Sequence, residues 1–457
     1  MITQADLTVQ TLGERGVVSP LGLSTIAGDD IADYVPDDAR VLFDVEVRGD
    51  APLARDLRFE KAGPRHQIYF DPAKIRAGIV TSGGLCPGIN NVIRGLVLEL
   101  HHKYRVREIL GFRYGFEGLD PETALAPIPF GPEAVSSIHK QGGSVLGLSR
   151  GRRDIGRMVD TLEEKGIDLL FAIGGDGTLR GAHAIAEEIG RRGQKRAVIG
   201  VPKTIDNDIP FVDKTFGFDT AVELARLAVD AAHTEATGAF HGVGLVKLMG
   251  RDAGFIAANA TLASADVNFC LIPEVPFELG GPMGLLAVLH RRLLARGHAL
   301  IVIGEGCGAT LAKAENAERD ASGNIRYASQ GIDVGPRIRD AIIAHFGTLK
   351  FPVNVKYIDP SYMLRGVPAN AADAIFCDAL ARNAVHAGMA GKTDVVIGRW
   401  HRHFTHVPLS LTTVEKKRIN ADGSLWLSVC ETTGQPPLSN SVVLTQEARP
   451  SWRPSSL

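Results

Sequence analysis

Residues 169–178 have the sequence Leu-Leu-Phe-Ala-Ile-Gly-Gly-Asp-Gly-Thr, an apolar run that ends in glycines around one aspartate. A short apolar run bounded by a turn signal is typical of a buried strand, and a helical pattern starts at about Thr178. The same succession occurs earlier, where residues 77–81 precede a glycine-rich turn and a helix from about Asn91. Strand, glycine turn and helix together predict parallel βαβ units.

Further apolar runs and helical patterns extend this organisation along the chain. The predicted strands at 197–202, 243–249 and 299–306 each end in polar or glycine-rich residues, and helical patterns follow at 282–296, 333–345 and 370–387. The sequence therefore predicts an α/β protein with two doubly wound, largely parallel-sheet domains. Because ligands of such sheets bind beyond the carboxyl ends of the strands, the residues there are candidates for chemistry.

Length and composition suggest where the domains begin and end. A chain of 457 residues exceeds what one hydrophobic core usually organises. We expect an irregular N-terminal extension over residues 1–75 with a strand or two, among them a piece at 41–45. Two α/β domains should follow at 76–230 and 231–410, and residues 411–457, rich in Pro and Ser toward the end, should be a peripheral segment.

Charge and cysteine usage exclude several classes of protein. Lys and Arg number 50 against 52 Asp and Glu, so no overall charge attracts nucleic acid or an acidic membrane. Five scattered cysteines without a CxxC pair fit a reducing cytosol better than a disulfide scaffold or a zinc site. No signal-peptide pattern opens the chain, and no apolar run approaches the ~20 residues that span a bilayer. We expect a cytoplasmic protein without nucleic-acid or membrane partners.

The loop at residues 81–91, Thr-Ser-Gly-Gly-Leu-Cys-Pro-Gly-Ile-Asn-Asn, is a candidate phosphate site. Glycines let backbone N–H groups approach an anion, and a helix N-terminus favours negative charge. The loop lacks the Gly-Lys-Ser/Thr of a Walker A loop and does not match GxGxxG. From the residues alone, a phosphate site and a plain strand-to-helix turn fit equally well.

The second glycine loop, Gly174-Gly175-Asp176-Gly177-Thr178, adds a carboxylate. A hard oxygen ligand beside anion-binding N–H groups suits a magnesium-bridged polyphosphate. The alternative is a turn in which the aspartate caps a helix. The motif also occurs in NAD kinases and lipid kinases, so by itself it indicates only a nucleotide-dependent kinase.

Residues 202–208, Pro-Lys-Thr-Ile-Asp-Asn-Asp, place two carboxylates after a predicted strand. Phosphorylation of an alcohol needs a carboxylate that orients the hydroxyl and accepts its proton, which Asp206 or Asp208 could supply. Lys203 could neutralise charge on the transferred phosphoryl group. The alternative is a polar loop with Asx turns.

These motifs, in this order and followed by Met249-Gly250-Arg251, resemble the phosphofructokinase family over about residues 75–410. The resemblance implies a 6-phosphofructokinase that transfers the γ-phosphoryl group of ATP, with Mg2+, to the 1-hydroxyl of fructose 6-phosphate in glycolysis, giving fructose 1,6-bisphosphate and ADP. It implies that residues 76–230 bind the donor nucleotide and magnesium and that residues 231–410 bind the sugar phosphate. It also implies a homodimer or homotetramer.

The resemblance assigns the donor side to three loops and one tyrosine. Asp176 corresponds to the magnesium ligand, and Arg150, from the loop at 142–150, to an arginine that contacts the transferring phosphoryl group. Tyr114 falls near the nucleotide by a looser match. The implied donor-binding residues are Gly84, Tyr114, Arg150, Gly151, Gly175, Asp176, Gly177 and Thr178.

The resemblance likewise assigns the catalytic and sugar-binding residues. Asp206 corresponds to the base that takes the proton of the 1-hydroxyl, Asp208 to the second acid, and Arg365 to the arginine on the 6-phosphate with Lys356 as a second cation. A planar guanidinium suits that role because it pairs two phosphate oxygens. The implied catalytic residues are Arg150, Lys203, Thr204, Asp206 and Asp208, and the implied sugar-binding residues are Thr204, Ile205, Asp206, Met249, Gly250, Arg251, Glu305, Lys356, Tyr362, Met363, Leu364 and Arg365.

Two positions bear on the phosphoryl donor. Pyrophosphate users of the family commonly carry Asp where this chain has Gly177, filling the space of the α-phosphate of ATP, so ATP should fit. Lys203 stands where simple bacterial ATP enzymes have Gly, and lysine there is typical of pyrophosphate users. The combination resembles the ATP-dependent branch of plants and trypanosomatids. A pyrophosphate-dependent fructose 6-phosphate 1-phosphotransferase is the alternative, and a NAD or lipid kinase a more distant one.

Three further interpretations complete the sequence-based picture. A non-catalytic relative should have lost Asp206 or Arg251, and both are present. The stretch His401-Arg402-His403-Phe404-Thr405-His406 is better explained as a polar edge or loop than as a zinc site, and Lys416-Lys417-Arg418 as a solvated face. We expect Asp206 to face the sugar alcohol while Asp176, through its cation, holds the polyphosphate opposite.

Overall fold

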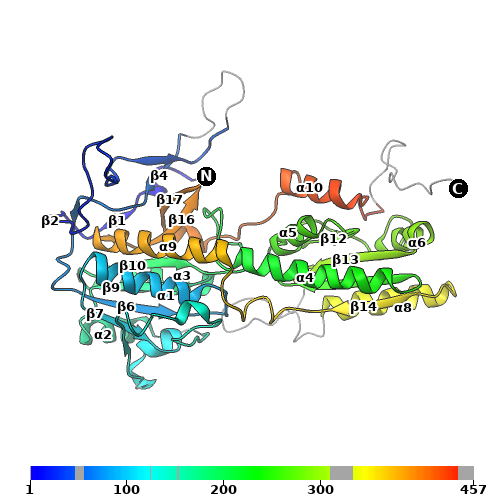
Figure 1. Cartoon of the computed structure of the whole chain (residues 1–457), viewed down its shortest axis with the longest axis horizontal. Helices are drawn as coiled ribbons and strands as arrows, with labels where there is room; N and C mark the ends of the chain where they lie inside the picture. Colours follow the sequence, from blue (N-terminus) through cyan, green and yellow to red (C-terminus); the bar gives the residue numbers. More distant parts are fainter. Residues whose placement is uncertain (1, 47–55, 124, 152–153, 309–332, 441–457) are drawn as a thin grey trace. The chain divides into compact units, whose positions relative to one another are not determined.

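The computed structural model (Figure 1) divides the chain into two compact units, each built from separate stretches of sequence. The structure describes residues 2–46, 56–123, 125–151, 154–308 and 333–440. Unit 1 comprises Met1–Thr204, Ile209–Gly217 and Arg365–Lys416, and unit 2 comprises Ile205–Asp208, Phe218–Leu364 and Lys417–Leu457. Residues 365–410 thus belong to unit 1, and the sequence-based boundaries at 75, 230 and 410 stay a prediction.

A nine-stranded sheet forms the centre of unit 1. Its five inner strands β16, β10, β9, β6 and β7 are parallel to one another, and the remaining strands add to both edges in antiparallel fashion. In spatial order the strands are β3 (Arg40–Leu42), β4 (Arg58–Lys61), β17 (His403–Pro408), β16 (Val395–Trp400), β10 (Ala197–Pro202), β9 (Leu169–Gly174), β6 (Arg76–Thr81), β7 (Glu108–Phe112) and β8 (Ile128–Pro129). The parallel strands expected at 77–81, 169–173 and 197–202 are confirmed, because fully buried strands carry continuous apolar runs.

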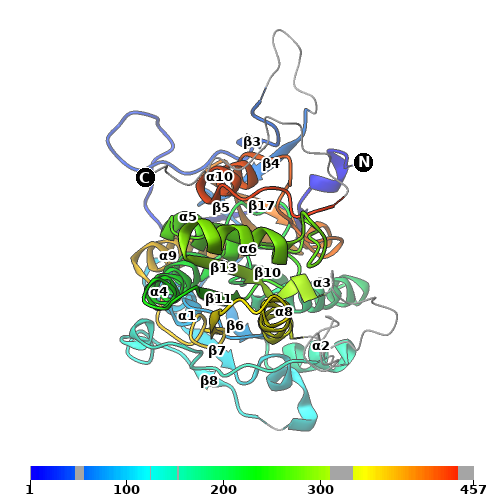
Figure 2. The same cartoon turned by 90° about the vertical axis from the view of Figure 1, so that its right-hand side faces the viewer.

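Helices cover both faces of this sheet, as Figure 2 shows. Helices α1 (Ile89–Leu98) and α9 (Ala371–Met389) pack together on one side, where Gly95 allows close approach to Ala381. Helices α2 (Ile155–Glu164) and α3 (Asp176–Arg191) pack together on the other, burying Leu162, Leu179 and Ile185. The 3-10 helices of unit 1 are η1 (Ala5–Leu7), η3 (Gly115–Leu119), η4 (Pro121–Thr123), η5 (Ile138–Lys140) and η8 (Leu409–Thr413), and α1 continues as the π-helix η2 (Glu99–Lys103).

The N-terminal extension is more regular than the sequence suggests. It contributes β3 and β4 to the main sheet, and two small antiparallel pairs, β1 (Gln10–Thr11) with β15 (Lys392–Thr393) and β2 (Val17–Val18) with β5 (Gln67–Ile68). Within the piece expected at 41–45, the strand ends at Leu42. Of the histidine-rich segment, His401 and Arg402 form the turn between β16 and β17, as a loop was expected there, whereas residues 403–406 belong to β17, which pairs with β4 and is therefore not a sheet edge.

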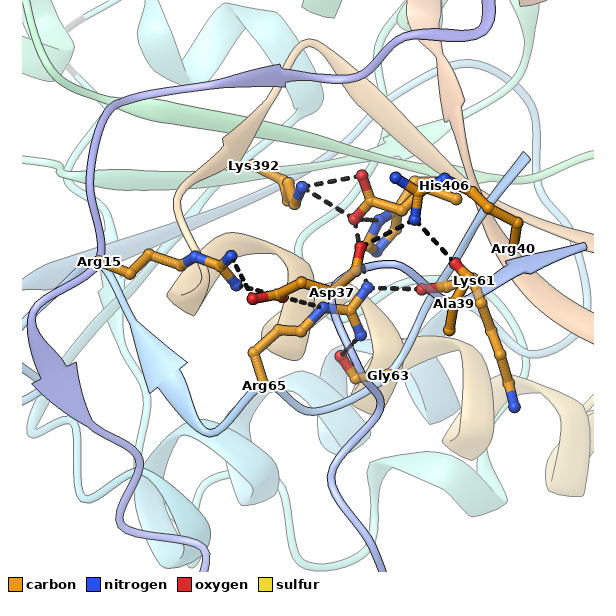
Figure 3. Close-up of polar contacts among 10 residues, drawn as sticks. Arg15, Asp37, Ala39, Arg40, Lys61, Gly63, Arg65, Lys392 and His406 are labelled. Carbon is orange, nitrogen blue, oxygen red and sulfur yellow. Dashed lines mark hydrogen bonds and ion pairs between the residues drawn. The ribbon is translucent and has the colours of Figure 1, made fainter. Parts of the chain in front are cut away.

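A cluster of charged side chains joins the extension to the sheet (Figure 3). The carboxylate of Glu60 on β4 accepts hydrogen bonds from Nδ1 of His406 at 3.0 Å and from Lys392, and lies 3.2 Å from Nη2 of Arg65. Burial alone would raise the pKa of Glu60, but the hydrogen bonds and charges of His406 and Lys392 lower it well below its usual value. Lys392 and His406 lie outside the extension and are almost fully buried. Their contacts with Glu60 therefore tie the extension to the rest of unit 1.

Unit 2 contains a four-stranded, fully parallel sheet. In spatial order its strands are β12 (Phe269–Leu271), β13 (His298–Gly304), β11 (Gly242–Leu248) and β14 (Asn354–Ile358). The helices within its described residues are α4 (Phe218–Thr237), α5 (Phe255–Ser264), α6 (Leu285–Arg296), α8 (Val334–Thr348) and α10 (Ser424–Thr433), with the 3-10 helix η6 (Glu305–Cys307). The strands expected at 243–249 and 299–306 are confirmed, which together with unit 1 confirms the α/β fold class.

Helix α10 lies in the segment that the sequence presents as peripheral. It packs against α5 and β12 and buries Trp426 and Val429, while the residues after 440 lie outside the described part of the chain. Within the described residues, none of the helices combines the length and apolar character that crossing a membrane requires.

Candidate active site

The first glycine loop connects β6 to α1 and is fixed by a second loop. Gly83 and Gly88 adopt φ angles of +93° and +97°, which side chains with a Cβ rarely tolerate. The backbone N–H of Gly83 and the hydroxyl of Ser82 donate to the carbonyl of Ser149 at 3.0 and 3.1 Å. Since Ser149 precedes Arg150, these two hydrogen bonds join the glycine loop to the arginine loop.

Three cationic side chains converge on Gly84. A methyl group built at this glycine would lie 3.1 Å from Nη2 of Arg150 and 3.6 Å from Nη1 of Arg365. The ammonium of Lys203, a residue only 4% exposed, donates to the carbonyl of Gly84 at 2.5 Å. Cations gathered beside a glycine-rich strand end form a site for a polyanion such as a phosphate chain. The sequence did not predict that Arg365 lies here.

Asp176 is the first residue of α3 and follows two close-packed glycines. A Cβ on Gly174 would come within 2.2 Å of Thr178 Oγ1, and the amide of Lys203 donates to the carbonyl of Gly174 at 2.9 Å. The carboxylate Oδ2 of Asp176 lies 2.9 Å from Nη1 of Arg180 and 3.2 Å from Nζ of Lys416. The loop therefore places one carboxylate at a helix N-terminus, whose dipole attracts anions.

The oxygen ligands available at Asp176 suit magnesium only if a phosphate group supplies further ligands. Among the residues that the structure describes, no three His, Cys, Asp or Glu side chains form a group that could hold a metal ion. Magnesium is usually bound by one or two carboxylates together with substrate phosphates and water. A single aspartate beside helix N–H groups meets that description.

The segment at 202–208 runs through both units. Lys203 and Thr204 belong to unit 1, where the carbonyl of Thr204 accepts a hydrogen bond from the hydroxyl of Thr215 at 2.7 Å. Ile205–Asp208 belongs to unit 2. Asp208 is 4% exposed, whereas Asp206 is half-buried. The predicted approach of Asp206 to Asp176 would join the two units and stays a prediction.

Lys417 holds this acidic segment from a distant part of the sequence. Its ammonium donates to Oδ1 of Asn207 at 3.1 Å, and its backbone N–H donates to the carbonyl of Asp208 at 2.9 Å. Asn207 needs such support because its φ of +54° is uncommon for a residue other than glycine. The ammonium also lies 5.2 Å from the ring centroid of Phe255. The prediction that Lys416-Lys417-Arg418 is a solvated face is therefore wrong for the two lysines, which pair with motif residues.

The expected sugar-binding residues that follow β11 and β13 lie at the carboxyl ends of these two central strands of the unit 2 sheet. These strands are parallel neighbours with Leu248 opposite Gly304, so Met249, Gly250 and Arg251 follow one strand and Glu305 follows the next. The N–H of Gly306 donates to the carbonyl of Gly250 at 3.2 Å. Gly250 has a φ of +120°, and a Cβ there would lie 2.5 Å from the carbonyl oxygen of Ala253. The structure thus brings these four predicted residues together.

The remaining predicted sugar residues are more dispersed. Lys356 lies within β14 opposite Gly244 of β11, Tyr362 and Met363 are more than 70% exposed, and Leu364 is fully buried. Arg365 belongs to unit 1 and Lys356 to unit 2, so their joint role at a 6-phosphate stays a prediction.

Sequence reasoning missed Lys247, which lies inside the apolar strand β11. Its ammonium lies 2.7 Å from Oδ2 of Asp359 and 3.0 Å from Oδ1 of Asp333, the N-cap of α8. Burial opposes the charge of Lys247, but the hydrogen bonds with Asp359 and Asp333 raise its pKa above the usual value. Asp359 in turn accepts from the N–H of Ser361 at 3.1 Å, next to Tyr362. A single lysine within an apolar strand does not reveal from the sequence which distant carboxylates it will contact.

Tyr114, the loosest of the predicted donor residues, packs on the arginine loop. Its φ is +54°, its N–H donates to the carbonyl of Leu146 at 2.7 Å, and a Cβ on Gly147 would lie 2.6 Å from its ring. The side chain remains 43% exposed. An exposed aromatic ring beside the Arg150 loop is compatible with a nucleotide contact.

An α/β protein whose glycine-rich loops gather cations and a carboxylate at the strand ends is typical of phosphotransferases, and this chain belongs to the phosphofructokinase family. The sequence profile of that family, phosphofructokinase, matches residues 76–388. This match covers all four motifs, so the alternative of a NAD or lipid kinase, which rested on Gly174–Thr178 alone, has no support.

Individual members of the family are similar over most of the chain. The ATP-dependent 6-phosphofructokinase of Borreliella burgdorferi is 46% identical over 440 residues, covering 94% of this chain and 97% of that protein. ATP-dependent 6-phosphofructokinase 7 of Arabidopsis thaliana is 46% identical over 405 residues, covering 88% and 82%. The crystal structure of a pyrophosphate-dependent phosphofructokinase from Marinobacter aquaeolei matches with a TM-score of 0.63, covering 84% and 98%. At 20% identity, that likeness shows the fold alone.

Proposed function

We propose that the protein is an ATP-dependent 6-phosphofructokinase, which transfers the γ-phosphoryl group of ATP to the 1-hydroxyl of fructose 6-phosphate. The observation that carries the proposal is the gathering of Arg150, Lys203 and Arg365 around Gly84. It occurs in a chain that is 46% identical, over 94% of its length, to a relative named for this activity.

On the donor side, the residues of unit 1 bind and orient the phosphate chain. The N–H groups at the start of α3 and the glycines at 84 and 175–178 accommodate the phosphates, and Asp176 would hold magnesium together with them. Magnesium supplies neutralisation of the developing phosphate charge. Gly177 leaves the space that the α-phosphate of ATP requires, which supports ATP as the donor.

On the acceptor side, Asp206 takes the proton of the 1-hydroxyl as the sugar oxygen attacks phosphorus. Lys203 and Arg150 stabilise the negative charge of the transferring phosphoryl group. Thr204, Ile205 and the second acid Asp208 complete this segment. Met249, Gly250, Arg251 and Glu305 bind the sugar, and Arg365 with Lys356 binds the 6-phosphate, with Tyr362, Met363 and Leu364 beside them.

One observation favours the pyrophosphate-dependent reaction as a second candidate. Lys203, the residue type typical of pyrophosphate users, is buried and bonded to the first glycine loop. Purified protein assayed with fructose 6-phosphate and either ATP or pyrophosphate, with and without Mg2+, separates the two. Turnover with ATP and magnesium alone supports the proposal, and turnover with pyrophosphate alone would overturn it.

The remaining expectations concern location and assembly. We propose a cytoplasmic enzyme that forms a homodimer or homotetramer and acts only on small molecules. Light scattering on the purified protein, at concentrations that span its expression level, distinguishes the two oligomers, and a monomer at every concentration would contradict both.

A further inference from the structure

An exposed aromatic side chain lies at the end of the unit 2 sheet that is opposite to the predicted sugar-binding residues. Phe240 is 75% exposed and comes just before β11, whereas Met249 follows the other end of the same strand. Substrates of parallel sheets bind beyond the carboxyl ends of the strands, so Phe240 is not expected to contact the sugar. Exposed apolar surface marks an interaction site where it belongs to a larger patch, and the surroundings of Phe240 form such a patch.

The ring of Phe240 is the outer end of a stack of rings that reaches the core. Its centroid lies 4.0 Å from that of His241, which stacks on Phe351 at 4.2 Å with an interplanar angle of 14°. Phe351 lies 5.5 Å from Phe346, a fully buried residue of α8. Nδ1 of His241 is 3.0 Å from the carbonyl oxygen of Pro352. Because this stack orders the exposed ring in advance, a partner that covers it has less conformational entropy to remove.

Two residues with left-handed backbone conformations lie in the loops on which the stack is built. The φ angles are +48° at His241 and +55° at Lys350, values that are uncommon for residues other than glycine. The loops are joined where β11 and β14 begin, since Gly242 pairs with Asn354 and the N–H of Asn354 donates to the carbonyl of His241 at 3.2 Å. Strained residues of this kind persist where the surrounding structure holds them, and they cluster at functional sites. The strain is therefore consistent with a surface that has a function.

The surface carries both partners of a cation–π contact. Phe240 presents the face of its ring that His241 does not cover, and Lys350 presents an exposed side chain next to Leu349, which is 46% exposed. An ammonium group is attracted to the face of an aromatic ring. A second copy of the chain would supply a cation for Phe240 and a ring for Lys350, and a two-fold axis would make this contact twice. The surface is therefore complementary to itself.

We propose that Phe240, Leu349 and Lys350 form a self-association surface, on which two copies of the chain pair about a two-fold axis. Phe240 of each copy lies against Lys350 of the other, and the two Leu349 side chains are removed from water beside them. The inference rests on the proposed homo-oligomer and assigns the surface that forms it. The predicted sugar-binding residues, at the other end of β11, stay outside this contact.

Sedimentation velocity of the full-length protein over a range of concentrations tests the pairing. Phe240→Ser and Lys350→Glu should each raise the dissociation constant of the dimer roughly a hundredfold, because two symmetry-related contacts are lost at once. Phe240→Lys should have a similar effect, since it places two ammonium groups opposite each other. The double variant Phe240→Lys/Lys350→Glu should associate more tightly than either of its single variants, because each contact then joins an ammonium to a carboxylate.

Two controls show whether the effect is specific. Leu427→Ser removes a side chain that is 57% exposed on α10, elsewhere in unit 2, and should leave the dissociation constant unchanged. The thermal unfolding midpoint of Lys350→Glu, measured where both proteins are monomeric, should match that of the unchanged protein because the lysine side chain is exposed. Loss of association in this variant is then separated from loss of folding.

Four results would contradict the inference. Association that survives both Phe240→Ser and Lys350→Glu would overturn it and would assign the surface to a different partner. An equal loss from Leu427→Ser would show that the effect is not specific to this surface. A double variant no tighter than its single variants would exclude the reciprocal contact. An unchanged protein that is monomeric at every concentration would overturn the proposed homo-oligomer together with this inference.

Discussion

The ammonium of Lys247 lies 2.7 Å from the carboxylate of Asp359, which begins the loop that carries Tyr362 and Met363. The same ammonium reaches Asp333 at the start of α8. One buried cation thus links a central strand of unit 2, a helix cap and a predicted substrate loop. Because Lys247 lies two residues before Met249, we predict that it positions the residues after β11 that are proposed to bind the sugar.

Replacing Lys247 with Met should impair sugar binding selectively. Two carboxylates would then face each other without a cation, and the loop after β14 would shift, so KM for fructose 6-phosphate should rise on the order of tenfold to a hundredfold. KM for ATP should stay near its original value. Steady-state kinetics with each substrate varied, and Arg339→Met on the surface of α8 as a control, would check this. Equal effects on both KM values would indicate a general loss of folding.

Arg365 could bind either the 6-phosphate of the sugar or the phosphate chain of the donor. If it binds the 6-phosphate, Arg365→Met should raise KM for fructose 6-phosphate roughly tenfold or more, with a smaller effect on ATP. Its position 3.6 Å from a Cβ built on Gly84 makes the opposite outcome informative. A rise in KM for ATP alone would assign the guanidinium to the donor. Lys356→Met serves as the comparison, since it should affect only the sugar.

Asp206→Ser should lower turnover by a factor on the order of 10²–10⁴, because no other group would take the hydroxyl proton. Binding of fructose 6-phosphate should remain largely intact, as equilibrium titration would show. Near-normal turnover would exclude Asp206 as the base and would direct attention to Asp208.

Glu60 should stabilise unit 1 at neutral pH. Because its pKa is lowered in the folded state by His406 and Lys392, the stabilisation is complete above the unfolded pKa of about 4.3 and is lost as the pH falls below it. Removing one partner of a buried ion pair costs about 3–5 kcal/mol, which we expect for Glu60→Gln in urea unfolding at pH 7. Glu164→Gln, an exposed carboxylate paired with Lys165, should have little effect. Equal stability of the two variants would contradict a structural role for the cluster.

Asp394 should give the stability of unit 1 a pH dependence opposite to that from Glu60. Burial raises its pKa to about 6, although the imidazole of His183 at 2.8 Å opposes the shift. Between pH ~4 and 6 the unfolded chain therefore releases a proton that the folded protein retains, so stability falls as the pH rises through this window. Asp394→Asn should remove that slope. Urea unfolding of both proteins from pH 4.5 to 7.5 would show the difference shrinking at low pH, and parallel curves would contradict it.

The parallel strands and glycine loops could be predicted because their determinants are local. Strands β6, β9, β10, β11 and β13 are predominantly apolar, and the helical patterns expected at 282–296, 333–345 and 370–387 correspond to helices α6, α8 and α9. The resemblance to the family is confirmed by the family match, and its motifs pointed to the candidate site, whose residue roles stay a prediction. The partners of Lys247, Lys416 and Lys417 could not be predicted, since they depend on which distant segments meet. Helix α10 and the strands of the extension other than β3 were missed for the same reason: tertiary contacts stabilise short elements whose own pattern is weak.

The order in which the strands of unit 1 are synthesised differs from their order in space. Strands β16 and β17 lie inside the nine-stranded sheet, yet they are encoded near the end of the chain, after the four strands and most of the helices of unit 2 that the structure describes. A ribosome must therefore deliver residue 408 before the gap between β10 and β4 can be filled. Until then, the edges of β4 and β10 that will pair with β17 and β16 have no partner strand. A chaperone that covers these edges during translation would have to stay bound until β17 is complete.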